Sequence, residues 1–229
     1  MGDRDDDADD AGTTPTLPPD HETHLDRNRR VWGRWSDHYT LSEQDFEPLR
    51  EATMVRLDLA PGDRVLDVGC GPGVNFAYLR ERVGSSGKVL GIDYSPQMVE
   101  RARDRVSEAG WENVEVVRAD ATTADLGEGF DAAVATLSLS VMPAPERTLR
   151  NIHDSLAPGG RLAVVDLRPI PSGPLRLFNP LISRLLRLVA NWNADANVED
   201  ALRETFGEFE HLERGFGGTV FAAVVRKPA

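Results

Sequence analysis

Short apolar runs alternate with amphipathic stretches through the middle of the chain. The apolar runs have the length of buried strands and cover residues 64–69, 88–93, 114–119, 130–138 and 161–167. The stretches between them carry apolar residues at helical spacing and cover residues 74–83, 97–109 and 145–156. Strands that alternate with helices pack as a parallel sheet with helices on both faces, so we expect an α/β fold with a Rossmann-like, doubly wound sheet.

Turn and capping residues mark the ends of several of these elements. Pro61-Gly62-Asp63 predicts a turn before the first strand. Ser95 predicts a helix N-cap, and Pro96 follows it at the first helical position. Pro158-Gly159-Gly160 predicts a stop before the fifth strand.

The N-terminal part follows a different pattern. Residues 1–20 are rich in Asp, Thr and Pro and lack hydrophobic periodicity, which is typical of a disordered acidic tail. Residues 21–60 predict a helical lead-in that is interrupted near Tyr39 and Thr40. We expect a single folded domain over residues 21–229, because a chain of this length suits one domain.

The alternation also ends after the fifth strand. A proline-rich segment leads into an apolar helix at residues 179–192, inside an inserted segment of about 172–195. Two later strands, 208–214 and 219–226, are joined by Gly215-Phe216-Gly217-Gly218. Such a short glycine-rich connection favours an antiparallel hairpin, so the expected sheet is mostly parallel with an antiparallel C-terminal end.

The charge balance is acidic. The chain has 38 Asp and Glu residues against 26 Lys and Arg, a formal charge of −12, and residues 1–20 carry about half of this excess. Two of the basic residues are lysines, and the other 24 are arginines. An Asp-rich, Lys-poor surface stays hydrated at high salt, which favours a halophilic source over GC-rich coding bias. Such a surface repels phosphate backbones, so we expect no nucleic acid partner.

Signals for export and for metal binding are missing from the sequence. It contains no apolar run suited to a signal peptide or a membrane span, so we expect a cytoplasmic protein. The single cysteine, Cys70, excludes an internal disulfide and a thiolate cluster for zinc. His21 and His24 form an isolated H-x-x-H pair without further ligands, so we expect no metal.

A glycine-rich turn after the first strand is the clearest sign of a ligand site. Residues 65–73 read VLDVGCGPG, with glycines at positions 69, 71 and 73 and Asp67 two residues before the first of them. Glycines allow the backbone to turn sharply and to approach a ligand closely, and the next helix points its free N–H groups at the turn. Val74 stands where the dinucleotide fingerprint has its third glycine, so the turn fits a pyrophosphate only in part.

Polar residues also stand at the carboxyl ends of the next strands, where ligands of open parallel sheets bind. Asp93 follows the second strand and Asp120 the third, and Thr136 to Ser138 end the fourth. Asp93 lies about 20 residues beyond the turn, where a carboxylate accepts hydrogen bonds from ribose hydroxyls. Its alternative role, capping the following helix, is already filled by Ser95.

Five ordered motifs together resemble those of the class I S-adenosylmethionine-dependent methyltransferases, in particular the ubiquinone and menaquinone methyltransferase group. The motifs are VLDVGCGPG at 65–73, GIDYSPQM at 91–98, ADA at 119–121, FDAA at 130–133 and LAPGGRL at 156–162. They span about residues 64–166, and five motifs in order are far more specific than one glycine turn. The resemblance implies S-adenosylmethionine as the cofactor.

The resemblance also implies which residues contact that cofactor. Asp67 and the glycine turn are implied to face its methionine portion, Asp93 its ribose, and Asp120 with Ala121 its adenine. The residues after the fourth strand are implied to face the transferring methyl group. The full set expected on this basis is Tyr39, Asp67, Gly69, Cys70, Gly71, Gly73, Asp93, Tyr94, Met98, Asp120, Ala121, Thr136 and Leu137.

The charges at this site separate two kinds of cofactor. S-adenosylmethionine is cationic at sulfur, carries an ammonium group and has no phosphates, so carboxylates near the turn attract it and repel a dinucleotide's pyrophosphate. Asp67 therefore favours a methyltransferase over a nicotinamide-dependent oxidoreductase. A non-catalytic module that binds S-adenosylmethionine remains a second alternative, which differs from an enzyme only in turnover.

Methyl transfer needs an acceptor atom held in line with the sulfur–methyl bond and shielded from water. We expect a small-molecule or lipid-like acceptor, but the sequence specifies neither its identity nor the oligomeric state. An acidic acceptor would use a general base, for which His38 and Asp166 are the candidates, with His24 and Asp37 beside them. Tyr39 belongs to an aromatic lead-in that resembles the segment covering the cofactor in many family members, so we expect it to enclose the cofactor.

The inserted helix at 179–192 has three interpretations. Arg184, Arg187 and Asn191 share one stripe, while leucines such as Leu185 and Leu188 cover much of the remaining surface. A helix of this kind closes over an acceptor as a lid, lies on an anionic membrane as a peripheral contact, or packs on the sheet edge. The sequence leaves these three interpretations open.

Overall fold

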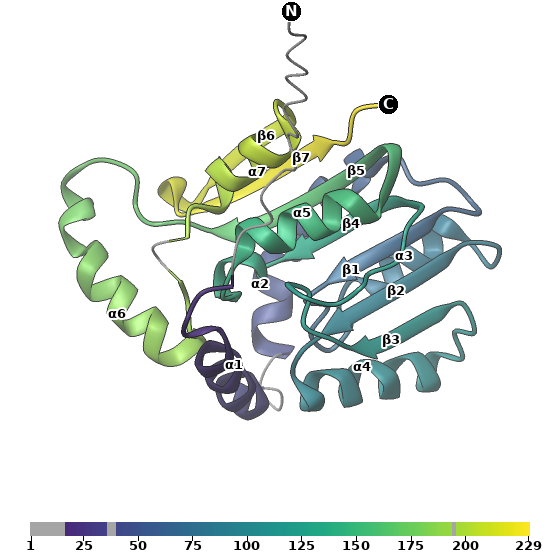
Figure 1. The fold of residues 1–229 in the computed structure, drawn as a ribbon, viewed down its shortest axis with the longest axis horizontal. Coiled ribbons are helices and arrows are strands. Elements are labelled where there is room, and N and C mark those ends of the chain that lie inside the picture. Colours follow the sequence, from purple (N-terminus) through teal and green to yellow (C-terminus); the bar gives the residue numbers. More distant parts are fainter. Residues whose placement is uncertain (1–16, 36–39, 194–195) are drawn as a thin grey trace, which may run out of the picture.

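The computed structural model describes residues 17–35, 40–193 and 196–229, and its centre is a seven-stranded sheet (Figure 1). The strands are β1 (Arg64–Val68), β2 (Lys88–Asp93), β3 (Val114–Arg118), β4 (Phe130–Thr136), β5 (Leu156–Leu167), β6 (Phe209–Gly215) and β7 (Val220–Arg226). Their order in the sheet is β3-β2-β1-β4-β5-β7-β6. Strands β1 to β5 pair in parallel, and β7 pairs antiparallel with both β5 and β6. The predicted doubly wound sheet with a C-terminal antiparallel hairpin is therefore confirmed.

Helices cover both faces of this sheet (Figure 1). They are α1 (His21–Trp35), α2 (Thr40–Met54), α3 (Phe76–Val83), α4 (Pro96–Ala109), α5 (Pro145–Ser155), α6 (Asn179–Ala190) and α7 (Val198–Phe206). Short 3-10 helices are η2 (Val55–Leu57), η3 (Leu139–Val141), η4 (Pro174–Phe178) and η5 (Phe216–Gly218). The predicted helical lead-in contains α1 and α2, which end at Trp35 and begin at Thr40, respectively. Residues 36–39, and residues 1–16 of the predicted acidic tail, lie outside the described residues.

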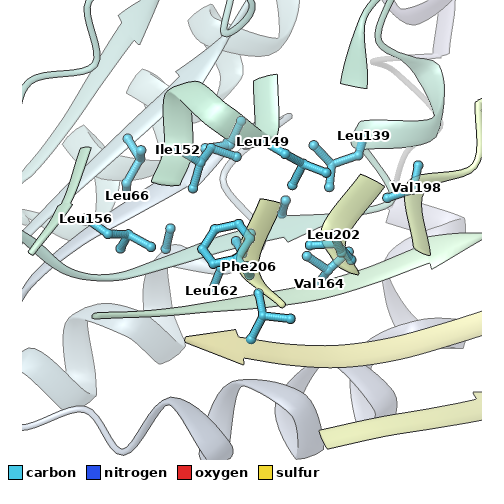
Figure 2. Packing of buried hydrophobic residues seen from close by; sticks show 14 of the residues in the cluster. Leu66, Leu139, Leu149, Ile152, Leu156, Leu162, Val164, Val198, Leu202 and Phe206 are labelled. Atoms are coloured by element: carbon cyan, nitrogen blue, oxygen red, sulfur yellow. The ribbon is translucent and has the colours of Figure 1, made fainter. Parts of the chain in front are cut away.

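Two hydrophobic clusters hold the helices against the sheet. On one face, Leu66 of β1 belongs to the same cluster as Leu149 of α5 and Phe206 of α7, and Figure 2 shows these side chains packed between strand and helices. On the other face, Val65 clusters with Phe76 of α3. Neighbouring residues of β1 enter opposite clusters because successive side chains of a strand point to opposite faces. This packing fixes the carboxyl ends of the parallel strands β1 to β4 side by side at one end of the sheet.

One strand begins earlier than the sequence predicts. β5 starts at Leu156 and not at residue 161, so the predicted stop at residues 158–160 is an irregular part of the strand. The backbone N–H of Gly159 donates to the carbonyl of Lys227, and the N–H of Lys227 donates to the carbonyl of Gly160. These two bonds pair the glycines with the residue that follows β7. They therefore extend the strand through a segment that would form a turn without this neighbour.

One helix is missing from the sequence prediction. α7 begins after Asn197, whose side chain accepts a hydrogen bond from the backbone N–H of Asp200 at 3.2 Å. It buries Val198, Leu202 and Phe206 at helical spacing against the cluster that contains α5. The cap and the spacing are both present in the sequence, so local signals for this helix exist.

The inserted helix differs from all the others in its surroundings. α6 stands away from the sheet, at the left of Figure 1, and its C-terminal end lies beside α1. None of its residues is buried. It ends at Ala190, because Asn191 adopts a left-handed backbone conformation with φ of 54°. No helix in the described part of the chain combines the length and the apolar character needed to cross a bilayer.

Candidate functional site

The glycine turn after β1 is held in place by the neighbouring strand. Gly69, Gly71 and Gly73 have φ values of 68°, 54° and 78°, a region that side chains other than glycine rarely adopt. The backbone N–H groups of Gly69 and Cys70 both donate to the carbonyl of Ile92 at the end of β2, at 2.8 and 3.0 Å. Two hydrogen bonds therefore tie the turn to the carboxyl end of β2.

The three glycines have different surroundings. A Cβ atom on Gly69 would lie 2.5 Å from the Cβ of Ser138, and one on Gly73 would lie 2.5 Å from the ring of Phe76. A Cβ atom on Gly71 would meet no other atom within 4 Å. Gly69 and Gly73 thus serve close packing inside the protein, while Gly71 borders open space in which a ligand fits.

A cavity lies at the carboxyl ends of β1 to β4 and brings most of the predicted cofactor residues together. The predicted residues along its wall are Gly69, Gly71, Asp93, Tyr94, Met98, Asp120, Ala121, Thr136 and Leu137. Leu25, Asn28 and Trp32 of α1 close another side of this cavity. Sequence reasoning missed these three residues, because nothing in a local pattern tells which strand ends a preceding helix will cover.

Asp67 lies beneath the turn and not along the cavity wall. Its carboxylate is inaccessible to solvent and accepts hydrogen bonds from Nδ2 of Asn75 at 3.2 to 3.3 Å. The same Nδ2 lies 3.1 Å from Oγ1 of Thr136, which lines the cavity. Burial raises the pKa of Asp67 to about 7, and hydrogen bonding by Asn75 opposes that rise. The structure therefore gives Asp67 a bracing position between β1, α3 and β4.

Cys70 and Gly73 also lie outside the cavity wall. The thiol of Cys70 is buried, and this burial raises its pKa well above the usual value. A protonated, enclosed thiol has little nucleophilic or metal-binding capacity. Within the described part of the chain, no group of three or more His, Cys, Asp and Glu residues is arranged to hold a metal ion.

Asp93 connects the glycine turn to the next helix. One carboxylate oxygen accepts from the backbone N–H of Gly71 at 2.9 Å, and the other accepts from the N–H of Ser95 at 2.8 Å. Burial raises the pKa of Asp93, and the bonds from Ser95 and Gly71 oppose that rise. A carboxylate accepts about four hydrogen bonds, and the backbone N–H groups of Ser95, Gly71 and Tyr94 supply three, so Asp93 retains capacity to accept from a ligand in the cavity.

Asp120 is held from three sides at the end of β3. Nε2 of His21 lies 2.8 Å from its Oδ2, the hydroxyl of Thr123 donates to Oδ2 at 3.0 Å, and the N–H of Thr122 donates to Oδ1 at 3.0 Å. His21 belongs to α1, so this contact fixes the start of α1 over the cavity. The sequence gives no local signal for a contact between residues 99 positions apart.

Further contacts fasten α1 across the site. Nε2 of His24 and Nδ2 of Asn28 both bond to the carbonyl of Val141 in η3, at 2.8 and 2.7 Å. Nδ2 of Asn191, at the end of α6, donates to Oδ1 of Asn28 at 2.6 Å and to the carbonyl of His24. His24, one of the candidate general bases, is thus occupied in a backbone contact, and burial lowers its pKa.

Leu137 has an unusual backbone at the end of β4. Its φ is 54°, which is rare for a bulky residue and costs about 1 to 3 kcal/mol when the surroundings enforce it. The enforcing contacts are the bond from the Leu137 N–H to the carbonyl of Val165 at 2.7 Å and the bond from Ser138 Oγ to the carbonyl of Val68 at 2.8 Å. Strained residues of this kind cluster at functional sites, and Leu137 lines the cavity.

The remaining candidate bases lie elsewhere. Asp166 is fully buried and accepts from Oγ and N of Ser140, at 2.5 and 2.9 Å, and from the N–H of Leu167. Burial raises its pKa to about 6. Asp166 is not part of the cavity wall and braces η3. His38, Asp37 and Tyr39 lie outside the described residues.

A second cavity of about 370 Å³ lies beyond β5. Its wall is mainly polar and includes Arg168, Arg176, Asn179 and Glu199, together with Ile170. Glu199 pairs with Arg168 and also with Arg214 of β6. This cavity borders the beginning of the inserted segment that contains η4 and α6.

Comparisons with known proteins agree with this geometry. A family model described as a methyltransferase domain matches residues 59–212. The chain is 33% identical over 177 residues to a phosphatidylethanolamine N-methyltransferase of Cereibacter sphaeroides, covering 76% of this chain and 84% of that protein. It is also 33% identical to an aklanonic acid methyltransferase of a Streptomyces strain, covering 69% and 74% of the two chains. A demethylmenaquinone methyltransferase of Listeria monocytogenes is 30% identical, with coverage of 72% and 71%.

Solved structures extend the similarity to the fold. An S-adenosylmethionine-dependent methyltransferase of Aquifex aeolicus superposes with a TM-score of 0.56 at 25% identity, covering 77% of this chain and 88% of that one. A geranyl diphosphate C-methyltransferase of Streptomyces coelicolor gives a TM-score of 0.66 at 15% identity, covering 79% and 76%. The second similarity is one of fold.

Proposed function

The chain belongs to the S-adenosylmethionine-dependent methyltransferases, and we propose that it transfers the methyl group to an apolar small molecule or a lipid-like acceptor. The observation that carries this proposal is the cavity at the strand ends in which the open side of Gly71 meets Asp93 and Asp120. Relatives support the acceptor class, because their names refer to a phospholipid, a quinone precursor and aklanonic acid.

We assign the parts of the cofactor to the ends of successive strands. Asp93 is the proposed partner of the ribose hydroxyls, since backbone N–H groups orient both of its oxygens and its carboxylate retains capacity to accept. Asp120 and Ala121 are the proposed adenine contacts, and the open side of Gly71 is the proposed place of the methionine portion. Asp67 contributes indirectly, by bracing the turn through Asn75.

Charge favours this cofactor over a nicotinamide dinucleotide. The cavity wall carries the carboxylates of Asp93 and Asp120, and its lining contains no lysine or arginine among the described residues. A pyrophosphate in this place would meet two carboxylates without a cation, whereas a sulfonium and an ammonium group are attracted. The cofactor, when bound, supplies an activated methyl group on a positively charged sulfur, which is its own leaving group.

The protein's own contribution is then positioning and the exclusion of water. Leu137 and Met142 give the β4 side of the cavity an apolar surface next to Ser138. Asp166 and His24 are both engaged in internal hydrogen bonds, so we propose no proton transfer for either. His38 and Tyr39 stay as predicted candidates for a base and for cofactor enclosure. An acceptor atom held in line gains most of its reactivity from orientation.

Calorimetric titration tests the cofactor half of the proposal. We expect S-adenosylmethionine or S-adenosylhomocysteine to bind at about micromolar levels, and Asp93→Ala to weaken binding strongly because both ribose acceptors are lost. Asp104→Ala, an exposed carboxylate on α4, is the matched control and should bind normally. Heat from NADH, without heat from either adenosyl ligand, would overturn the assignment.

An assay of S-adenosylhomocysteine release tests the acceptor half. Pools of quinols, phospholipids, phenols and amines are offered at low and at multimolar salt, and we expect turnover with an apolar or amphiphilic pool. Turnover confined to charged, water-soluble amines would contradict the proposed acceptor class. Absence of turnover with every pool, together with normal cofactor binding, would favour the non-catalytic module.

We also propose that the protein works in a salt-rich environment. Its acidic excess of −12 and its 24 arginines against two lysines support this setting. The expected result is activity retained at multimolar salt, measured in the same release assay. The cytoplasmic location stays a prediction from the sequence.

A further inference from the structure

The inserted segment carries most of the large apolar side chains that the described part of the chain exposes. Residues 174–190, which form η4 and α6 and are called the arm below, hold six of these nine side chains. They are Leu175 (61% exposed), Leu177 (84%), Phe178 (53%), Leu181 (67%), Leu185 (57%) and Leu188 (76%). Exposed apolar groups at this density mark a binding surface, because an isolated soluble protein rarely keeps such a patch in water.

The exposed leucines form one stripe of α6. Leu181, Leu185 and Leu188 follow the i, i+4, i+7 spacing that places side chains on one helix face. Ile182, Leu186 and Val189 are centred roughly a quarter turn around the helix from this stripe and are half-buried. α6 therefore has an inner apolar side toward the protein and a second, outer one that no part of the described chain covers. Packing on the sheet edge, one of the three interpretations of this helix, does not account for the outer stripe.

Charge is as unevenly distributed as apolar surface. Residues 167–194 contain four arginines and no Asp or Glu, in a chain whose formal charge is −12. Three of these arginines, Arg176, Arg184 and Arg187, belong to the arm, and all three are exposed. Arg184 and Arg187 flank the leucine stripe on one side of α6. The arm is thus a basic, apolar segment on an acidic protein.

This combination selects an anionic lipid surface as the partner. An interfacial helix inserts its apolar stripe among acyl chains while flanking arginines reach the lipid phosphates. The acidic remainder of the protein is repelled by the same surface, which leaves the arm as the part in contact. A second copy of the chain fits less well, since a two-fold interface would bring the arginines of one arm against those of the other.

The arm is fastened to both cavities at its two ends. Arg176 and Asn179, at its beginning, line the second cavity. Just beyond its other end, Asn191 donates to Asn28, which lines the proposed cofactor cavity. The backbone N–H of Asn193 donates to the carbonyl of Ser140 in η3 at 2.7 Å. A bilayer in contact with the arm therefore lies close to residues that line both cavities.

We propose that the arm docks the enzyme on an anionic bilayer and that the acceptor enters from the lipid beside α6. The acceptor part of this inference rests on the proposed methyltransferase function, whereas the docking part does not. Arg176 and Asn179 then lie where the polar end of an amphiphilic acceptor leaves the bilayer.

Vesicle binding by the full-length protein tests the docking. The protein is sedimented with vesicles of phosphatidylglycerol and phosphatidylcholine and, separately, with vesicles of phosphatidylcholine alone. We expect the unmodified protein to bind the anionic vesicles. At low salt, changing Arg176, Arg184 and Arg187 together to Gln should weaken this binding about 100-fold. Replacing Leu181, Leu185 and Leu188 together by Ser should weaken it at least about tenfold, also at high salt.

Matched controls lie on η2, away from the arm. Val55→Ser removes an exposed apolar side chain, 57% exposed, and Arg56→Gln removes an exposed charge. Both should bind vesicles like the unmodified protein. Since every altered side chain is exposed, all variants should fold, which is checked by thermal unfolding and by binding of S-adenosylhomocysteine.

Three outcomes overturn the inference. The first is no binding of the unmodified protein to either vesicle, and the second is equal binding by the serine variant. The third is a dimer in sedimentation velocity that the serine variant converts to a monomer without any vesicle binding, which would make the stripe an interface between copies. Failure of the proposed function looks different, because vesicle binding would persist while neither adenosyl ligand bound.

Discussion

The half of the molecule around β1 to β4 encloses its binding surface, whereas the part that follows β5 exposes apolar side chains to solvent. The first half encloses its ligand cavity with residues that are bonded to one another across three strands, as Gly71 is to Asp93. The second leaves Leu177 and Leu188 more than three-quarters exposed. The first half suits a ligand of fixed shape, and the second suits a partner that is fluid or variable. The same division separates the proposed cofactor from the proposed acceptor.

Breaking the first half should have the largest effect on stability. Gly69→Ala forces a Cβ atom to within 2.5 Å of Ser138 at a φ of 68°. We expect the free energy of unfolding to fall by about 3 to 5 kcal/mol, because backbone strain and overpacking add at this position. Urea denaturation measures the change.

Two other glycines provide the comparison for Gly69→Ala. Gly110→Ala has a φ of 64° with no atom within 4 Å, so it should lose only the conformational part, about 1 kcal/mol. Gly71→Ala has the same open surroundings, so its stability should match that of Gly110→Ala while its cofactor affinity falls. Equal cofactor affinity in Gly71→Ala and the unmodified protein would contradict the place given to the ligand.

The buried carboxylate beneath the turn predicts a pH dependence. The pKa of Asp67 is about 7 in the folded protein and 3.8 in its ordinary state, so the folded protein binds this proton more tightly. The stabilisation is present below pH 4 and is lost as the pH rises toward 7. Asp67→Asn should remove this pH dependence of the free energy of unfolding. Between pH 4 and pH 8, the unfolding free energy of the variant should therefore gain about 2 to 4 kcal/mol relative to that of the unmodified protein.

Thermal unfolding between pH 4 and pH 8 measures this difference. Asp104→Asn, on the exposed face of α4, should follow the unmodified protein throughout. A curve for Asp67→Asn that runs parallel to that of the unmodified protein would show that Asp67 keeps an ordinary pKa in the folded state.

Removing a contact between α1 and the cofactor cavity should have a smaller effect on stability. His21→Ala removes the contact to Asp120 but leaves the bonds from Thr122 and Thr123. We expect a loss of about 1 kcal/mol in unfolding free energy and several-fold weaker binding of S-adenosylhomocysteine. Thr23→Ala, on the exposed side of the same turn, is the control. Unchanged affinity would separate α1 from the cofactor site.

The smallest effect on stability belongs to the second half. Replacing Leu185 and Leu188 by Ser should change the unfolding free energy by less than about 0.5 kcal/mol, because both side chains are already in water. We expect the KM for an apolar acceptor to rise while cofactor affinity stays constant. A loss above about 2 kcal/mol would mean that α6 is packed against the protein on its outer side.

The fold was largely predictable because its signals are local. Strand-length apolar runs and helical spacing determine β1 to β5, and the glycine connection after Arg214 determines the hairpin. The early start of β5 escaped prediction, since it depends on hydrogen bonds to Lys227 at the far end of the chain. α7 is different, because its cap at Asn197 and its apolar spacing from Val198 onward are local signals.

The residues of the site at the strand ends were predictable from the sequence, but the residues of α1 that cover the cavity were not. Asp93 is the last residue of β2 and Asp120 lies two residues beyond β3, so the topology of the sheet predicts their positions. His21, Asn28 and Trp32 come from a helix whose placement depends on contacts between residues about 100 or more positions apart. The exposure of α6 was undecidable from its sequence, because both of its sides are apolar.

The hydrogen bond from Asn191 to Asn28 joins the end of α6 to α1. Asn28 also donates to the carbonyl of Val141, so hydrogen bonds connect the end of α6, α1 and η3 in one set. Coupling between two binding events is reciprocal. If a partner bound to α6 increases the affinity of a ligand beneath α1, that ligand increases the affinity of the partner by the same factor. Lipid contact and cofactor residence time would then rise together, and hydrogen exchange in α1 would slow under either condition.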